Sequence, residues 1–157
     1  MSPLGSLAII ICAVLGSVAS VYGDVVLFDG WIKFYAGIYY HDPYLTMNFT
    51  TPNRCFNMAC DYLDGKIESA RWSGLPISGI AGKAYIAFYT DLNCKGSREV
   101  IQLPHNGGVR EFAIPQVKGN ITSFMVLGES KYHNWEGSRN VCGWTGSNVT
   151  NGVVSEP

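Results

Sequence analysis

The chain carries the same residues twice, 54 positions apart. IKFY at 32–35 matches IAFY at 86–89, and DGKIES at 64–69 resembles KGNITS at 118–123. Six pairs are identical in this ungapped register: Ile32/Ile86, Phe34/Phe88, Tyr35/Tyr89, Gly65/Gly119, Ile67/Ile121 and Ser69/Ser123. A half with about four short strands cannot bury both of its faces, so the repeat predicts two halves packed into one sandwich. The alternative is an unrelated β-sandwich that reuses common strand tetrapeptides.

Strand signals dominate the sequence. Apolar residues alternate at 31–35, 85–89 and 121–127, and Gly, Asn, Asp and Pro separate such segments at short intervals. The sequence HNGG at 105–108 predicts a turn, because Asn and Gly tolerate positive φ. After the first 23 residues, no run has the 3.6-residue period of a helix. We therefore expect an all-β domain.

The N-terminus resembles a secretory signal peptide. An unbroken apolar run of nine residues, Leu7–Leu15, is followed by small residues. It is shorter than the roughly 20 apolar residues of a membrane span, although an uncleaved anchor extending to Tyr22 is the alternative. We predict that residues 1–23 are removed, which leaves no stable membrane insertion, and that cleavage after Gly23 is favoured over cleavage after Ser20.

Charge and composition limit the function classes. The chain has 11 basic and 12 acidic residues, with no basic run, which argues against nucleic-acid binding. Its 13% aromatic and 15% charged residues indicate a well-filled core rather than disorder.

Four cysteines remain after signal removal, and on a secreted chain they predict two disulfides. Cys55, Cys60, Cys94 and Cys142 lack the paired CxxC spacing of structural zinc, and an oxidising compartment would consume a free nucleophilic thiol. Cys55 and Cys60 are an odd number of residues apart and would face opposite sides of a regular strand. Each is therefore expected to reach a distant partner, with two pairings open.

Three sequons fit a secreted surface: Asn48, Asn120 and Asn148 each begin an N-x-T triplet. Asn148, in the polar C-terminal segment, is the favoured glycosylation site.

The segment FYTDLNCKG at 88–96 resembles the Greek key motif of βγ-crystallins. That family has an aromatic residue, a Gly seven positions later in a folded-over hairpin, and a later Ser that packs against the hairpin. Tyr89, Gly96 and Ser123 match it. The resemblance implies a two-Greek-key βγ-crystallin-like sandwich over residues 24–130, followed by a disulfide-tethered tail at 131–157.

The first copy matches this motif less well. Tyr35 and Ser69 are present, but Asp42 stands at the glycine position. Because glycine is the residue suited to positive φ, we expect the first copy to close its hairpin differently.

Calcium binding, common in this family through the pattern [ND][ND]xx[ST]S, is not expected. KGNITS at 118–123 places Lys118 where a ligand belongs, and DGKIES at 64–69 keeps only Asp64 and Ser69. The three histidines lie far apart, and no GxSxG segment occurs. We therefore predict no metal, no cofactor and no catalytic residues.

A narrower resemblance covers most of the mature chain. RCFNMACDYLDGKIESARWSGLP, KAYIAFYTDLNCKG and ITSFMVLGES are similar to small secreted proteins of plant-pathogenic oomycetes. This implies export into the host apoplast and binding to a host extracellular protein or glycan, as an effector or elicitor. The alternatives are an inhibitor of a host hydrolase, with a loop protruding from residues 38–54, and a cytotoxic protein, against which the net charge of −1 counts.

Exposed aromatic residues are the candidate binding surface, since such residues are common in binding sites. They lie in a polar connection and in the tail: Tyr39, Tyr40, Tyr44, Trp135 and Trp144. The alternative is that both tryptophans fold back over the sandwich near Cys142.

Overall fold

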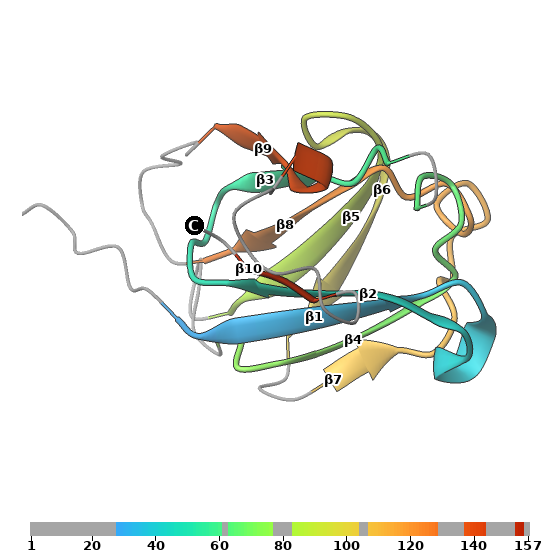
Figure 1. Ribbon diagram of the computed structural model, residues 1–157, viewed down its shortest axis with the longest axis horizontal. Helices are drawn as coiled ribbons and strands as arrows, with labels where there is room; N and C mark the ends of the chain where they lie inside the picture. Colours follow the sequence, from blue (N-terminus) through green and yellow to red (C-terminus); the bar gives the residue numbers. More distant parts are fainter. Residues whose placement is uncertain are drawn as a thin grey trace, which may run out of the picture.

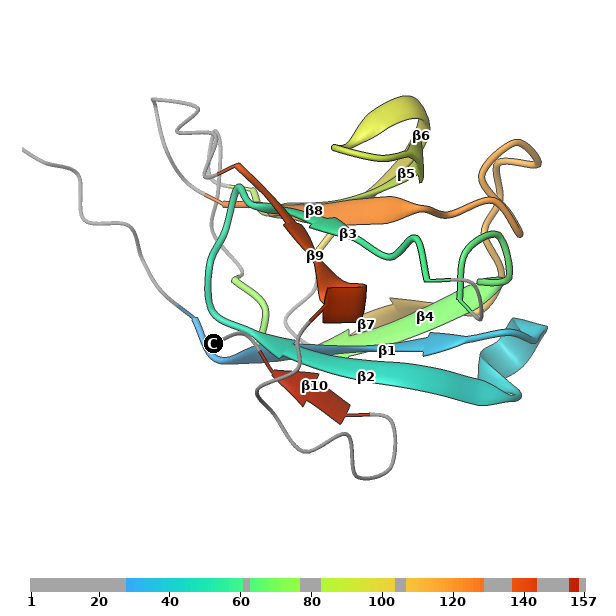
Figure 2. The same ribbon diagram turned by 45° about the horizontal axis from the view of Figure 1, so that its top comes forward.

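The computed structural model describes residues 28–60, 63–76, 83–103, 107–128, 137–143 and 153–155. The signal peptide, the 130/131 boundary, Trp135, Trp144 and Asn148 lie outside these residues. The described chain forms two β-sheets packed face to face, which Figure 2 shows as two layers.

Each half of the chain contributes three strands to one sheet and one strand to the other. We call the sheet with the order β10-β2-β1-β4-β7 sheet 1 and the sheet with the order β6-β5-β8-β3-β9 sheet 2 (Figure 1). The first half supplies β1 (Gly30–Tyr35), β2 (Pro43–Phe49), β3 (Cys55–Asn57) and β4 (Ser69–Ser73). The second half supplies β5 (Tyr85–Asp91), β6 (Lys95–Gln102), β7 (Gly107–Val109) and β8 (Ser123–Leu127).

The third strand of each half crosses to the other half's sheet. β3 pairs with β8, and β7 pairs with β4, both antiparallel. The halves are therefore interlocked, because neither sheet is complete without a strand of the other half. The topology is that of two Greek keys forming one sandwich, and the predicted fold class is confirmed.

The two repeated serines make the same hydrogen bonds. Ser69 Oγ donates to Gly37 O (2.6 Å) and accepts from Tyr40 N (3.2 Å). Ser123 Oγ donates to Asp91 O (2.6 Å) and accepts from Cys94 N (3.1 Å). Every partner is shifted by 54 residues, and both serines are fully buried. Each hydroxyl thus ties the last strand of its half to that half's folded hairpin, as the resemblance to the Greek key motif implied.

The expectation that the first copy closes its hairpin differently is wrong. Asp42 has a φ of 55°, in the left-handed region that Gly96 occupies with a φ of 75°. Asp tolerates this region better than most residues, because its short polar side chain can bond locally. The same backbone shape is therefore built twice, once with glycine and once with aspartate.

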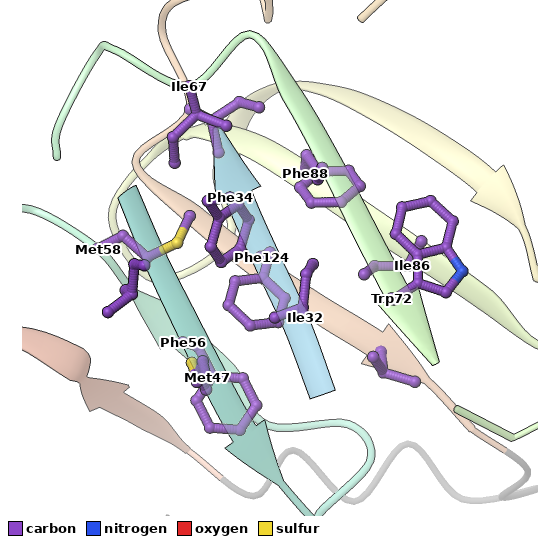
Figure 3. Packing of buried hydrophobic residues seen from close by; sticks show 14 of the residues in the cluster. Ile32, Phe34, Met47, Phe56, Met58, Ile67, Trp72, Ile86, Phe88 and Phe124 are labelled. Carbon is purple, nitrogen blue, oxygen red and sulfur yellow. The ribbon is translucent and has the colours of Figure 1, made fainter. Parts of the chain in front are cut away.

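Large apolar side chains from both sheets fill the space between the layers. Phe34 of β1, Phe88 of β5 and Phe124 of β8 lie side by side at the centre of Figure 3. The Phe34 ring centroid is 5.4 Å from that of Phe124 and 6.4 Å from that of Phe88. Because Phe34 and Phe88 are repeat-equivalent, each half places its central aromatic against the other half.

Two disulfides link distant parts of the chain, as expected. Cys55 of β3 bonds Cys94 at the tip of the β5–β6 hairpin, and Cys60 bonds Cys142. Cys142 lies in η3 (Val141–Gly143), directly after β9 (Ser138–Asn140), which runs parallel to β3. A further short strand, β10 (Val153–Ser155), runs parallel to β2. The C-terminal segment thus covers one edge of each sheet and is tethered by a disulfide.

Two segments differ from their predicted form. Gly107 and Gly108, expected in a turn, lie in β7, where Gly108 pairs with Arg71. Residues 38–54 do not form a protruding loop, because most of them belong to η1 (Ile38–Tyr40) and β2. The pairing of β2 with β1 places this segment inside sheet 1.

Candidate functional site

The outer face of sheet 1 carries aromatic and basic side chains. On β1 the inward positions Ile32 and Phe34 are fully buried, while Trp31 and Lys33 alternate with them and point outward. On β4, Arg71 is exposed and lies opposite Lys33 in the strand register. The alternation that fills the core therefore also presents tryptophan, lysine and arginine on one surface.

A groove of about 830 Å³ lies on this side of the molecule. Its lining comes from β1, β4, β7 and the segments beside them: Trp31, Tyr40, Arg71, Trp72, Ser73, Gly107, Gly108 and Arg110. We call this the Trp31–Arg110 groove. It combines residues from both halves of the chain, because β7 enters sheet 1 from the second half.

Tyr40 is held over this face by the folded hairpin of the first half. Tyr40 has a φ of 66°, and its backbone N–H donates to the buried Ser69 hydroxyl. Its ring centroid lies 5.6 Å from the Arg71 guanidinium carbon and 5.6 Å from the Tyr35 ring centroid. Lys33 Nζ lies 5.6 Å from the Tyr35 ring centroid. A cation is attracted to the negative face of a tyrosine ring. These contacts therefore hold four side chains in a row: Lys33, Tyr35, Tyr40 and Arg71.

The neighbouring wall of the groove is anchored to this hairpin through the backbone. Tyr39 N donates to Arg110 O at 2.7 Å, which joins η1 to the chain just after β7. The hydrogen bond fixes Arg110 relative to Tyr40 across the two halves.

Gly108 makes room for Tyr40. A Cβ atom at this position would lie 2.8 Å from the Tyr40 hydroxyl oxygen and 2.8 Å from Ala70 O. Both distances are shorter than ordinary van der Waals contact, so a side chain would force the tyrosine or the strand to move. Gly108 therefore has to lack a side chain, and Gly107 beside it in the lining has none either.

The groove is locally positive although the chain has a net charge of −1. Arg71 and Arg110 are both exposed, and within the described part of the chain neither forms an ion pair. Burial raises the pKa of Tyr35, and the positive charge of Arg71 partly opposes this effect. The unpaired guanidinium groups can attract an anion, because each offers several N–H donors in a planar fork.

The predicted tyrosines occupy three different environments. Tyr39 is 57% exposed, and Tyr40 lines the groove. Tyr44 lies within β2 and packs against the main core cluster. Sequence reasoning missed Trp31, Arg71 and Arg110. For Trp31 a signal was present, since it occupies an outward position in an alternating strand.

The segments at 64–69 and 118–123, which correspond to the family's calcium motif, make other contacts. Asp64 Oδ1 accepts a hydrogen bond from Thr122 Oγ1 at 2.7 Å. Lys118 Nζ donates to Glu111 Oε1 at 2.6 Å, and this hydrogen bond raises the pKa of Lys118. Among residues that the structure describes, no three His, Cys, Asp or Glu side chains gather as a metal site. The same residues include no helix long and apolar enough to cross a membrane.

Two of the three sequons can be located. Asn48 lies in β2 and is half-buried, and it pairs with Trp31 in the strand register. Asn120 is exposed, and its Nδ2 donates to Gln116 O at 3.3 Å. Of these two, Asn120 offers the more accessible side chain.

The comparisons with known proteins concern the fold. No family model and no curated protein matches the chain. A structure from work on the evolution of the eye-lens βγ-crystallin domain fold is similar at 13% identity and a TM-score of 0.41, covering 65% of this chain and 89% of its own. A double mutant of a βγ-crystallin domain from Clostridium beijerinckii is similar at 11% identity and a TM-score of 0.41, covering 62% and 96%. The strand order of the two sheets and the repeated serine hydrogen bonds define the double Greek key fold.

Proposed function

We propose that the protein is a secreted, non-enzymatic binding protein that recognises a host extracellular protein or glycan through the Trp31–Arg110 groove. The likeness of its sequence to small secreted proteins of plant-pathogenic oomycetes supports action in the host apoplast, as an effector or elicitor. Two disulfides fit an oxidising compartment.

One observation carries the binding role. Trp31, Tyr40 and two arginines without ion pairs in the described chain line one groove. Tryptophan, tyrosine and arginine are the residues that dominate binding energy at protein surfaces. An arginine that only kept the surface soluble would not need a tyrosine ring beside it. Arg71 lies over the Tyr40 ring, and Gly108 makes room for the Tyr40 hydroxyl.

Affinity capture tests the proposed function. The mature protein is immobilised and exposed to host extracellular fluid, beside the double variant Arg71→Ser/Arg110→Ser. The matched control is Arg98→Ser/Arg139→Ser, because both arginines are exposed on strands of sheet 2. We expect a ligand that wild type and control retain and the groove variant loses. Equal capture by all three proteins would contradict a role for the groove.

Export has a separate test. We expect the mature N-terminus at Asp24 and all four remaining cysteines oxidised. Intact-mass measurement of the protein secreted by a eukaryotic host, before and after deglycosylation, gives both. A mass that includes Cys12, or thiols that react under denaturing conditions, would contradict secretion through this route.

A further inference from the structure

We infer that the ligand of the Trp31–Arg110 groove is an acidic oligosaccharide, whose sugar rings carry carboxylates. This inference rests on the proposed function and narrows it to one ligand class.

The charges of the groove call for an anion. Arg71 and Arg110 line it, and Lys33 lies beside Arg71 on the same face. The outward positions of β1 and β4 hold no carboxylate: Trp31, Lys33, Tyr35, Ser69, Arg71 and Ser73. An isolated cluster of cations repels itself, and a bound anion removes this repulsion. Guanidinium groups bind carboxylates through two parallel hydrogen bonds, which specifies a planar anion.

The aromatic residues call for a ring with an apolar face. Trp31 is half-buried at an outward position of β1, and Tyr40 lies over Arg71 nearer the other end of the strand. A pyranose presents C–H groups on its faces and hydroxyls around its edge, so it can stack on these rings while its hydroxyls bond polar neighbours. The lining runs from Trp31 of β1 across Ser73 and Arg71 of β4 to β7, and a short oligosaccharide can follow this path across the strands.

A protein ligand fits the groove less well. Hot spots of protein–protein interfaces lie in well-packed pockets from which water is fully excluded on binding. This groove has a backbone floor at Gly107 and Gly108 and two guanidinium groups in its lining. Such a surface favours a polyhydroxylated anion over an apolar side chain.

Titration with matched sugars tests the inference. The probes are α-1,4-linked trigalacturonic acid and its fully methyl-esterified form, which has the same rings but no charge. Binding to the mature protein is followed by NMR, using the indole N–H of Trp31 and the Nε–H signals of the two arginines. We expect these signals to shift with the acid and not with the ester, and the affinity to fall as salt is added.

Variants assign the binding to the groove. Arg71→Ser and Arg110→Ser should each weaken binding of the acid about tenfold, as expected for loss of a charged hydrogen-bonding partner. Trp31→Ala should also weaken it, while Arg98→Ser should not. The melting temperature of each variant is measured first, to check that it equals that of the wild type. The wild-type NMR titration needs no variant and stands even if one fails to fold.

The outcomes separate this inference from the proposed function. Equal binding of acid and ester, or acid binding that survives loss of both arginines, would overturn it. If no sugar binds while a host protein is captured in an arginine-dependent way, the glycan inference fails and the binding function stands. If neither occurs, both fail.

Discussion

At the scale of single residues, the buried hydroxyls of Ser69 and Ser123 hold the two hairpins of the repeat in place. We expect Ser69→Ala and Ser123→Ala each to lower the free energy of unfolding by about 1–3 kcal/mol. Each change leaves a buried backbone N–H and a backbone C=O without their partner. Urea unfolding with intact disulfides gives the values, and the exposed Ser97→Ala should change stability by less than about 0.5 kcal/mol. A serine variant as stable as the wild type would show that its hydroxyl bonds contribute nothing.

Asp42 and Gly96 occupy equivalent positions in the two hairpins, and both have a positive φ although their side chains differ. We expect Asp42→Gly to raise stability by about 0.5–1 kcal/mol, because glycine adopts a φ near 55° without steric cost. Gly96→Val should lower it by about 1–3 kcal/mol or more, since a β-branched residue is strained at positive φ. The new Cβ would also lie 2.7 Å from Asp91 Cγ. Thermal unfolding compares them, and an Asp42→Gly variant below wild type would contradict the shared geometry.

The two disulfides act on different elements. Cys55–Cys94 joins β3 to the β5–β6 hairpin, whereas Cys60–Cys142 tethers the segment that adds β9 and β10 to the sheet edges. Loops of 39 and 82 residues give each bridge on the order of 4 kcal/mol. Both are thus comparable for stability, but only the second controls how the C-terminal segment is held.

Limited proteolysis should separate these roles. In Cys60→Ala/Cys142→Ala, we expect cleavage after residue 130 well below the melting temperature, with the two-layer core left intact. In Cys55→Ala/Cys94→Ala, the C-terminal segment should stay protected until the domain unfolds. Mass spectrometry of early fragments identifies the sites. Identical early cleavage in both variants would mean that the tether does not hold β9 and β10.

At the scale of the whole molecule, the sandwich should be indifferent to calcium. We expect millimolar calcium to leave the melting temperature unchanged, because Lys118 pairs with Glu111 and Asp64 with Thr122 where ligands would be needed. A specific site would add about 2.7 kcal/mol at 100-fold excess over its Kd. Differential scanning calorimetry with calcium or with EDTA measures this. A calcium-dependent rise that EDTA reverses would contradict the expectation.

The sequence by itself determined the repeat, the all-β class and the equivalence of Ser69 and Ser123, while the packing of these serines against the hairpins was implied by the resemblance to βγ-crystallins. Strand alternation and local spacing suffice for these features, because they depend on which face each side chain takes and on the repeated offset. The alternation at 31–35 also contained the signal for an outward Trp31, but the sequence-based prediction did not use it. The odd spacing of Cys55 and Cys60 argued against one pairing and left the choice between the other two open.

Only the tertiary structure decided which residues meet. The exchange of β3 and β7 between the sheets selected Cys55–Cys94 and brought Gly108 and Arg110 of one half beside Tyr40 and Arg71 of the other. It also placed Gly107 and Gly108 in a strand, where the missing side chain of Gly108 makes room for the Tyr40 hydroxyl. Local periodicity carries no information on which strands become neighbours, because that choice depends on burying the faces of both halves at once.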